Sequence, residues 1–137
     1  MIRRFFSASQ WSLALLPLLL CPLLLSAEEA SNGKEETADA RAKTAWEKIL
    51  AGALLVDVRT PEEFEQGHLE GAKNIPLGEI ERRIEEFGND FEREIVVYCR
   101  TGRRSGIART ILTKRGYKHV FNGGGLLELE KAKPKQP

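Results

Sequence analysis

The chain contains 137 residues, of which 21 are Lys or Arg and 20 are Asp or Glu, so its formal net charge is +1. This length fits one domain, and a content of 42% hydrophobic and 30% charged residues excludes a disordered, fibrous or multipass membrane protein. The near balance of charge gives no reason to expect a nucleic-acid partner, which usually binds a concentrated basic face. Two cysteines are too few for a disulfide-rich secreted scaffold.

The first 27 residues are typical of a secretory signal peptide. Arg3 and Arg4 give a basic start, residues 11–25 carry no charge, and the small residue Ala27 precedes an acidic stretch. A transmembrane anchor is one alternative, but the apolar run is shorter than the ~20 residues that span a bilayer, and it contains two prolines. A lipoprotein attached through Cys21 is another, but leucines precede this cysteine instead of small residues. We therefore expect cleavage after Ala27 and no stable membrane anchor in the mature chain.

The rest of the chain divides by composition. Residues 28–37 are polar and aperiodic and predict a flexible leader, residues 38–131 predict a single domain, and residues 132–137 predict a flexible tail. After cleavage the chain retains one cysteine, Cys99. A lone cysteine in an exported protein cannot form an internal disulfide, so Cys99 is either an inert core residue or a free reactive thiol.

The first half of the domain alternates between helical and strand patterns. Apolar spacing predicts a helix from Asp39 to about Gly52, whose apolar positions are Ala42, Ala45, Trp46, Ile49 and Leu50. Leu54–Val58 is a continuous apolar run, as in a buried parallel strand. The following segments are predicted as a helical turn at Pro61–Phe64, a loop at Gly67–Ala72 and a helix at Glu79–Phe87.

The second half repeats the alternation. Ile95–Tyr98 predicts a second buried strand, and apolar residues from Ile107 to Leu112 mark a helix after it. His119–Phe121 is expected to form a short strand, followed by a tight turn at Asn122–Gly125 and a terminal helical segment. Helices that alternate with apolar strands predict an α/β fold with a parallel sheet, whose ligands bind at the carboxyl ends of the strands. Cys99 stands at such an end.

Cys99 is followed at once by a glycine-containing loop and the start of a helix. Unpaired N–H groups in such a place bind anions, and Arg100, Arg103 and Arg104 add formal positive charge. This setting lowers the pKa of a thiol and favours the nucleophilic thiolate. An inert cysteine that closes a strand is the alternative, but three arginines and a glycine within five residues make an odd neighbourhood for a core position. The pattern predicts nucleophilic catalysis on an anionic substrate.

Three segments resemble the rhodanese family, in the family's order. Residues 57–76 are similar to its signature segment, residues 97–106 to its active-site loop, and residues 116–124 to its closing segment. The resemblance implies a single rhodanese-like domain with a central parallel sheet flanked by helices on both faces. It also implies a thiosulfate sulfurtransferase, in which Cys99 attacks the outer sulfur of thiosulfate, holds a persulfide and passes the sulfur to cyanide or to a small or protein thiol. For an exported member, the implied location is the periplasm.

The resemblance also implies roles for individual residues. Cys99 is the catalytic residue, and neither a metal nor an organic cofactor is implied. The implied substrate-binding residues are Arg100, Thr101, Gly102, Arg103, Arg104 and Ser105. Asp57, which ends its strand on the ligand side of the sheet, is a candidate site contact, whereas His68 and His119 are interpreted as structural and surface residues. Two departures from the family are the arginine-rich loop and the sequence Leu126–Leu129, where many relatives have a tryptophan.

Two other functions are open at the level of sequence. A sulfur carrier or redox-sensing thiol without rapid turnover would also use Cys99, and it would pass sulfur only slowly to small acceptors. A phosphatase or arsenate reductase would need an arginine six positions after the cysteine, where this chain has Ser105. Arg104 stands at the fifth position, which disfavours the latter function.

Overall fold

The computed structural model describes residues 37–135, all of which belong to one compact unit. The predicted signal peptide and nearly all of the predicted leader lie outside the described residues, so these two expectations stay predictions. Between residues 37 and 135, no helix is both long enough and apolar enough to cross a membrane.

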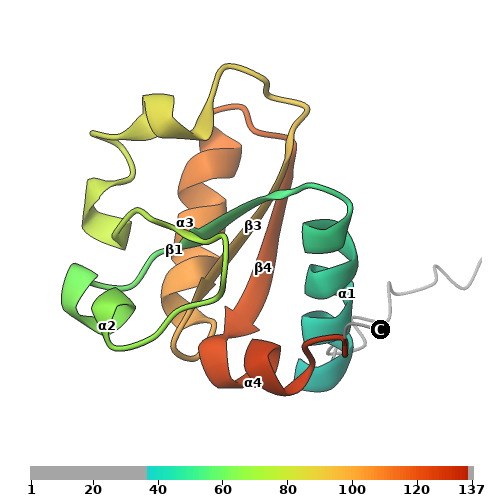
Figure 1. Ribbon diagram of the computed structural model, residues 1–137. Coiled ribbons are helices and arrows are strands. Elements are labelled where there is room, and N and C mark those ends of the chain that lie inside the picture. The colour runs from blue at the N-terminus through green and yellow to red at the C-terminus, as the bar shows by residue number, and fades with distance from the viewer. Residues whose placement is uncertain (1–36, 136–137) are drawn as a thin grey trace, which may run out of the picture. The chain divides into compact units, whose positions relative to one another are not determined.

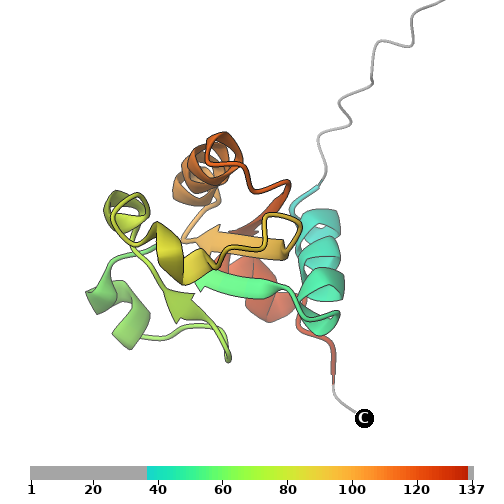
Figure 2. The ribbon, with the colours of Figure 1, turned by 90° about the horizontal axis from the view of Figure 1, so that it is seen from above.

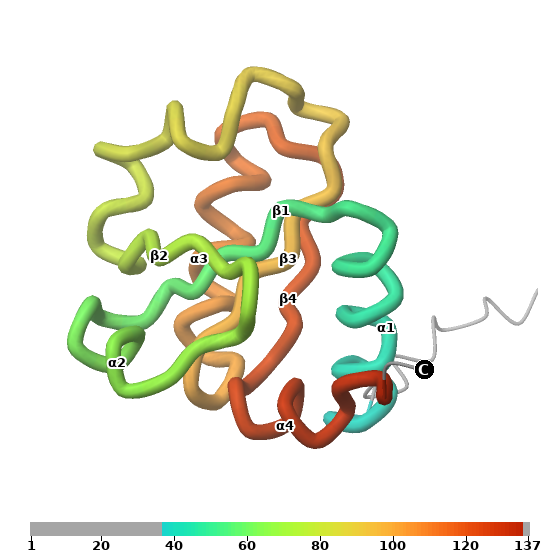
Figure 3. Tube along the Cα trace, in the orientation of Figure 1, coloured from blue at the N-terminus to red at the C-terminus, as the bar shows by residue number. Residues whose placement is uncertain are grey.

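Helices and strands alternate along the domain (Figure 1). In chain order they are α1 (Ala38–Leu50), β1 (Leu54–Asp57), α2 (Pro61–Glu65), β2 (Lys73–Asn74), η1 (Leu77–Glu79), η2 (Ile84–Phe87), β3 (Glu94–Cys99), α3 (Arg103–Lys114), β4 (His119–Gly125) and α4 (Leu126–Lys131), where η marks a 3-10 helix. The strands pair in parallel in the order β2-β1-β3-β4, and Figure 3 shows the path between them. The predicted α/β fold with a parallel sheet is confirmed.

The sheet is covered on both faces, as predicted, and the pattern along β3 shows why. Successive side chains of a strand point to opposite faces. Ile95, Val97 and Cys99 pack into a cluster with Ala108 and Leu112 of α3. The intervening residues of β3 pack into a second cluster with α1 and α4, which contains Val96, Tyr98, Ala42, Ala45, Trp46 and Leu129. Figure 2, viewed from above, shows α1 and α3 on opposite sides of the strands.

Helix α1 begins after a capping residue and buries most of its apolar side. Thr37 precedes α1, and its hydroxyl accepts a hydrogen bond from the N–H of Ala40. Trp46 is buried, as predicted, and its indole N–H donates to the Leu129 carbonyl at 2.7 Å. Leu50 was expected with the apolar positions of this helix, but its side chain is exposed. It is the last residue of α1.

The predicted helix at Glu79–Phe87 is wrong, because the structure has two separate 3-10 turns, η1 and η2. Arg83 leaves helical geometry at φ −108° and ψ 24°, which breaks the regular hydrogen-bond pattern. Its guanidinium instead pairs with Glu79 and Glu86, one on each side of the break. Ile80 and Phe87 are nevertheless buried and Ile84 is partly buried, because two short turns can also direct these side chains into the core.

The predicted end of the last strand is also wrong. β4 continues through Asn122–Gly125, where a turn was expected, and its register with β3 shifts at Gly123. The edge strand β2 was not predicted, because only two residues take part in it and neither is buried. Both differences occur where pairing with a neighbouring strand, and not local sequence, sets the backbone.

Candidate active site

Cys99 lies at the carboxyl end of β3, where a short loop leads into α3. The backbone N–H of Gly102 donates to its Sγ at 3.1 Å, and the Ser105 hydroxyl lies 3.4 Å from the same sulfur. Gly102 precedes the first residue of α3 with φ +91°, a conformation that L side chains rarely adopt. The glycine therefore turns the chain so that the donors of the loop and of the first helical turn point at one sulfur.

The surroundings of Cys99 lower its pKa. Burial raises the pKa of the thiol, because the residue is only 1% exposed, but the surrounding hydrogen bonds together outweigh this effect. The donors are the Ser105 hydroxyl and the backbone N–H groups of Ser105, Thr101 and Gly102. The net shift is downward, which favours the nucleophilic thiolate.

The side chain of Asn122 in β4 supports the cysteine loop through hydrogen bonds. This residue was not among the site residues expected from the sequence. Its side-chain amide donates to the Gly102 carbonyl at 3.0 Å, and its Oδ1 accepts from the Gly124 N–H at 3.0 Å. The same Oδ1 lies 2.7 Å from the Ser105 hydroxyl, whose single proton is shared between this oxygen and the Cys99 sulfur. One side chain thus ties together the loop, the first turn of α3 and the end of β4. Only the continuation of β4 through Asn122 brings the amide to this position, so no local motif could have indicated it.

The glycine run at the end of β4 packs directly against the cysteine loop. A Cβ at Gly125 would lie 2.5 Å from the Arg100 carbonyl oxygen, and one at Gly102 would lie 3.3 Å from the Gly124 Cα. Side chains at these positions would push the strand and the loop apart. The sequence predicts a tight turn here, but these residues end β4 and pack against the cysteine loop.

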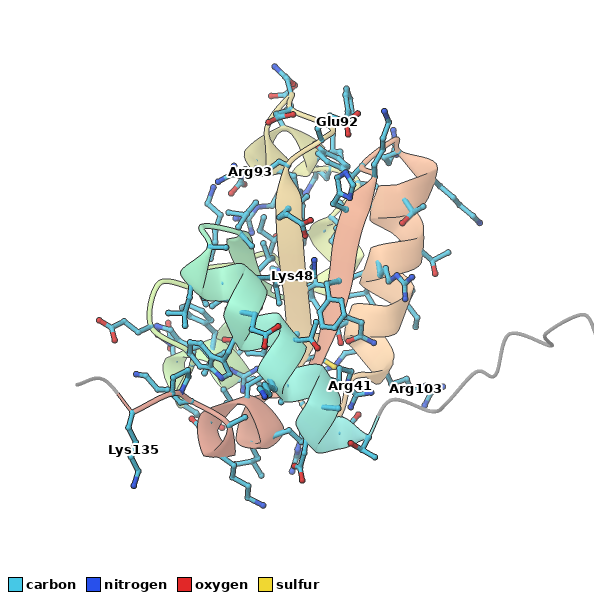
Figure 4. All side chains as sticks on the ribbon, turned by 90° about the vertical axis from the view of Figure 1, so that its right-hand side faces the viewer. Arg41, Lys48, Glu92, Arg93, Arg103 and Lys135 are labelled. Carbon is cyan, nitrogen blue, oxygen red and sulfur yellow. The ribbon has the colours of Figure 1, made fainter. Side chains whose placement is uncertain are left out.

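The three arginines of the loop have different surroundings. Both terminal nitrogens of Arg104 bind the Glu63 carboxylate of α2, at 2.6 and 2.8 Å. Arg100 and Arg103 are exposed and have no ion-pair partner within residues 37–135. Figure 4 shows Arg103 at the opposite end of the sheet from Glu92 and Arg93. Arg100 and Arg103 are therefore two unpaired charges of the cysteine loop and the helix start, whereas Arg104, whose charge interacts with Cys99, is engaged with α2.

A cleft of about 400 Å³ opens beside the loop. It lies between α2, the loop and α4, and it is lined by Arg59, Glu63, Gln66, Gly67, Arg100, Leu126, Leu127 and Glu130. Arg100 belongs both to this cleft and to the cysteine loop. The cleft therefore meets the cysteine loop at Arg100.

Asp57 has an internal partner. It is fully buried, and Arg59 donates to its carboxylate through Nε at 3.0 Å and Nη2 at 2.6 Å. The same guanidinium donates to the Gly67 carbonyl and lies over the Tyr98 ring. This geometry neutralises the charge of Asp57 inside the protein, and its role as a site contact stays a prediction.

The two histidines lie on the surface. The ring of His68 is exposed, stacks on Phe64 and hydrogen-bonds the Phe64 carbonyl through Nδ1. His119 is exposed and lies near the carboxylates of Glu92 and Glu94. Within residues 37–135, no group of three or more His, Cys, Asp or Glu side chains could hold a metal ion.

Comparison with known proteins decides the family. Residues 28–131 match the family model described as the rhodanese-like domain. The chain belongs to the rhodanese-like domain family. It is 44% identical over 87 residues to the thiosulfate sulfurtransferase PspE of Escherichia coli, a match that covers 64% of this chain and 84% of that protein.

A solved rhodanese from E. coli, described with anions, superposes on this rhodanese-like domain with a TM-score of 0.54 at 45% identity, covering 56% of this chain and 91% of that one. The chain is also 45% identical over 69 residues to YrkF of Bacillus subtilis, a putative sulfur carrier protein, covering 50% of this chain and 36% of YrkF. The family and these relatives support sulfur transfer in a general sense. The donor, the acceptor and the role of each loop residue are proposals.

Proposed function

We propose that this rhodanese-like domain is a thiosulfate sulfurtransferase that works through a persulfide on Cys99. The observation that carries the proposal is the convergence of the Gly102 N–H and the Ser105 hydroxyl on the Cys99 sulfur, in a loop and helix start whose Arg100 and Arg103 are exposed and have no ion-pair partner within residues 37–135. This site favours a thiolate before reaction, a dianion on approach and a negatively charged sulfur adduct afterwards. A neutral substrate would gain little from such an arrangement.

The reaction takes place in two displacements. The Cys99 thiolate attacks the outer sulfur of thiosulfate, a new S–S bond forms, and the S–S bond of thiosulfate breaks to release sulfite with its electron pair. The loop N–H groups then donate hydrogen bonds to the resulting persulfide anion, as they did to the thiolate. Cyanide or a thiolate then attacks the terminal sulfur, and Cys99 leaves as a thiolate. Each step balances in atoms and charge without an oxidant or a cofactor.

The loop arginines have distinct roles in this proposal. Arg100 and Arg103 attract thiosulfate and orient its sulfonate away from the attacking sulfur. Thr101 and Gly102 contribute backbone N–H groups to the bound sulfur. Arg104 acts mainly through its ion pair with Glu63, which joins α2 to the first turn of α3.

The proposed location is the periplasm. It rests on the basic start, the uncharged run and the small residue before the cleavage point in residues 1–27.

A sulfur carrier or redox-sensing thiol is the second candidate, favoured by the similarity to a putative sulfur carrier protein. A carrier would accept sulfur on Cys99 but would release it slowly to small acceptors. A phosphatase or arsenate reductase is a minor candidate. It is disfavoured because Ser105 stands six positions after the cysteine and Arg104 is paired with Glu63.

The deciding experiment is an intact mass measurement of the reduced mature protein before thiosulfate, after thiosulfate, and after cyanide. A gain of one sulfur atom at Cys99, removed by cyanide over many cycles, is expected. Sulfur that is gained but released only slowly would support the carrier. Folded, reduced protein that gains no sulfur would overturn the thiosulfate proposal, and phosphate and arsenate esters would be tested next.

A further inference from the structure

The charges of the domain are distributed unevenly along the chain. Between Ile95 and Leu127 there are seven Lys and Arg residues and no Asp or Glu, although the whole chain has 21 basic and 20 acidic residues. This acid-free segment contains β3, the cysteine loop, α3 and β4. Three of its cations are neutralised by acids from elsewhere, in the pairs Arg104–Glu63, Arg115–Glu81 and Lys118–Glu92.

Of the four cations that are not neutralised, one is Arg100 of the cysteine loop and three lie on the solvent side of α3. Arg103, Arg109 and Lys114 are exposed and have no ion-pair partner within residues 37–135. At 100° per residue, Arg103, Ile107 and Lys114 lie opposite the buried residues of the helix. Arg109 lies at the far edge of the exposed arc, separated from them by Thr110 and Thr113, and it lines one depression together with Lys114. We name Arg103, Ile107, Arg109 and Lys114 the α3 basic face.

An apolar side chain lies among these charges. Ile107 is 47% exposed although it sits on a helix with a well-packed inner side. Ile107 lies beside Arg103 and Lys114. The adjoining part of the exposed arc holds a depression of about 420 Å³ that is lined by Gly106, Arg109, Thr110, Thr113 and Lys114, without any acidic residue. An apolar anchor within a polar, charged rim is the usual composition of a protein docking surface.

The α3 basic face continues from the cysteine loop but extends far beyond it. Arg103 is the first residue of α3, while Lys114 lies eleven residues further along the helix, at a distance of about 16 Å. A thiosulfate ion or a small thiol at Cys99 cannot reach Arg109 and Lys114. Only a macromolecule can contact the loop and the far end of α3 together.

We propose that the α3 basic face docks an acidic protein whose thiol accepts the sulfur from Cys99. This inference rests on the proposed function, because the acceptor thiolate attacks the terminal sulfur of the Cys99 persulfide and Cys99 leaves as a thiolate. Charge complementarity speeds the encounter and fixes the orientation, and Ile107 adds a small apolar contact. The acceptor thus receives sulfur in preference to neutral thiols of equal reactivity.

The test uses persulfide loaded on Cys99 with inorganic polysulfide, so that loading does not depend on thiosulfate. The acceptors are cyanide and two peptides of about 12 residues, each with one cysteine and a reach of ~40 Å when extended. The peptides differ only in carrying Glu or Gln at the same positions. We expect transfer to the Glu peptide to be about tenfold faster than to the Gln peptide at low salt, and the advantage to shrink near 0.15 M salt.

Charge-reversal variants locate the effect. Arg109→Glu with Lys114→Glu should remove most of the advantage of the Glu peptide and leave transfer to cyanide unchanged. The matched control is Lys43→Glu with Arg93→Glu, which changes the net charge equally at two exposed cations outside α3 and should keep the advantage. If the first pair does not fold, Arg109→Gln with Lys114→Gln takes its place and should remove about half of the effect.

Several results would overturn the docking proposal. One is equal transfer to both peptides, and another is an equal loss in the α3 and control variants. A basic-face-dependent dimer in sedimentation, or binding to anionic phospholipid vesicles without peptide selectivity, would assign the face to a second copy or to a membrane surface. Failure of thiosulfate alone to load Cys99 would instead count against the proposed function, because the polysulfide-loaded protein still tests docking.

Discussion

Two neighbouring parallel strands, β1 and β3, both end in polar residues at the same edge of the sheet, but the two ends differ in how their polar groups are satisfied. At the end of β1, the Asp57 carboxylate is buried and fully engaged with Arg59. At the end of β3, several donors converge on the Cys99 sulfur while Arg100 and Arg103 stay unpaired. Internal neutralisation is typical of a structural pair, whereas unneutralised charge around a converged set of donors is typical of a site for an incoming anion.

The largest effect is expected from Cys99→Ser. The change is nearly isosteric and keeps the Gly102 N–H satisfied, but an alcohol cannot form the persulfide. We expect thiosulfate-dependent turnover to fall by on the order of 10³-fold or more, with a melting temperature close to that of the unchanged protein. A serine variant that is folded and still active would contradict the role of Cys99. Thiocyanate formation and circular dichroism measure the two properties.

Asp57→Asn should destabilise the fold by removing the buried ion pair between Asp57 and Arg59 at the end of β1. It leaves the buried guanidinium of Arg59 without a counter-charge, so the free energy of unfolding should fall by about 3 kcal/mol. Urea denaturation measures this loss, and Asp39→Asn, at an exposed acid of α1, is the control with little effect. The KM for thiosulfate of the folded fraction should stay unchanged. A raised KM with normal stability would instead make Asp57 a site contact.

Substitutions of the loop arginines should differ in their effect on the KM for thiosulfate, according to whether the arginine is already paired with an acid. Arg103→Ala should raise the KM for thiosulfate by about tenfold, and more at low salt, because an unpaired cation at the start of α3 attracts the dianion to the cysteine loop. Arg104→Ala should change KM less, since its charge is already compensated by Glu63. The order is read from steady-state kinetics at two ionic strengths. The reverse order would show that thiosulfate displaces Glu63.

Ser105→Ala should raise the pKa of the Cys99 thiol. The Ser105 hydroxyl helps to lower the pKa of Cys99, so its removal should move the pH profile of Cys99 alkylation to higher pH. At pH 7 the alkylation rate should fall about fivefold, as expected for one hydrogen bond, and recover at high pH. Thr101→Ala is the matched control, because it keeps its backbone N–H. A variant slowed equally at every pH would indicate misplacement of the sulfur and not a shifted pKa.

Glu63→Gln should have the smallest effect. The Arg104 guanidinium holds the pKa of Glu63 at about 2, below the ordinary carboxyl value of 4.5. The pair therefore stabilises the fold above pH 4.5, and this contribution is lost as the pH falls through about 2. The variant should lose about 1 kcal/mol of unfolding free energy at neutral pH, and its deficit should disappear in acid. A pH-independent deficit would indicate lost helix capping in α2, where the Glu63 side chain also accepts from the Thr60 N–H.

The local sequence determined the α/β class, the position of Cys99 at a strand end and the basic loop, because each rests on periodicity or on adjacent residues. Only the tertiary structure decided how the loop arginines differ, because Glu63 reaches Arg104 from a helix forty-one residues away. It also decided the extent of β4 and thereby the position of Asn122, since strand pairing overrides the turn propensity of glycine. The reactive thiol and the loop cations are adjacent in the sequence and could be predicted from it. The pairing of Arg104 and the hydrogen bonds of Asn122 depend on contacts between distant segments.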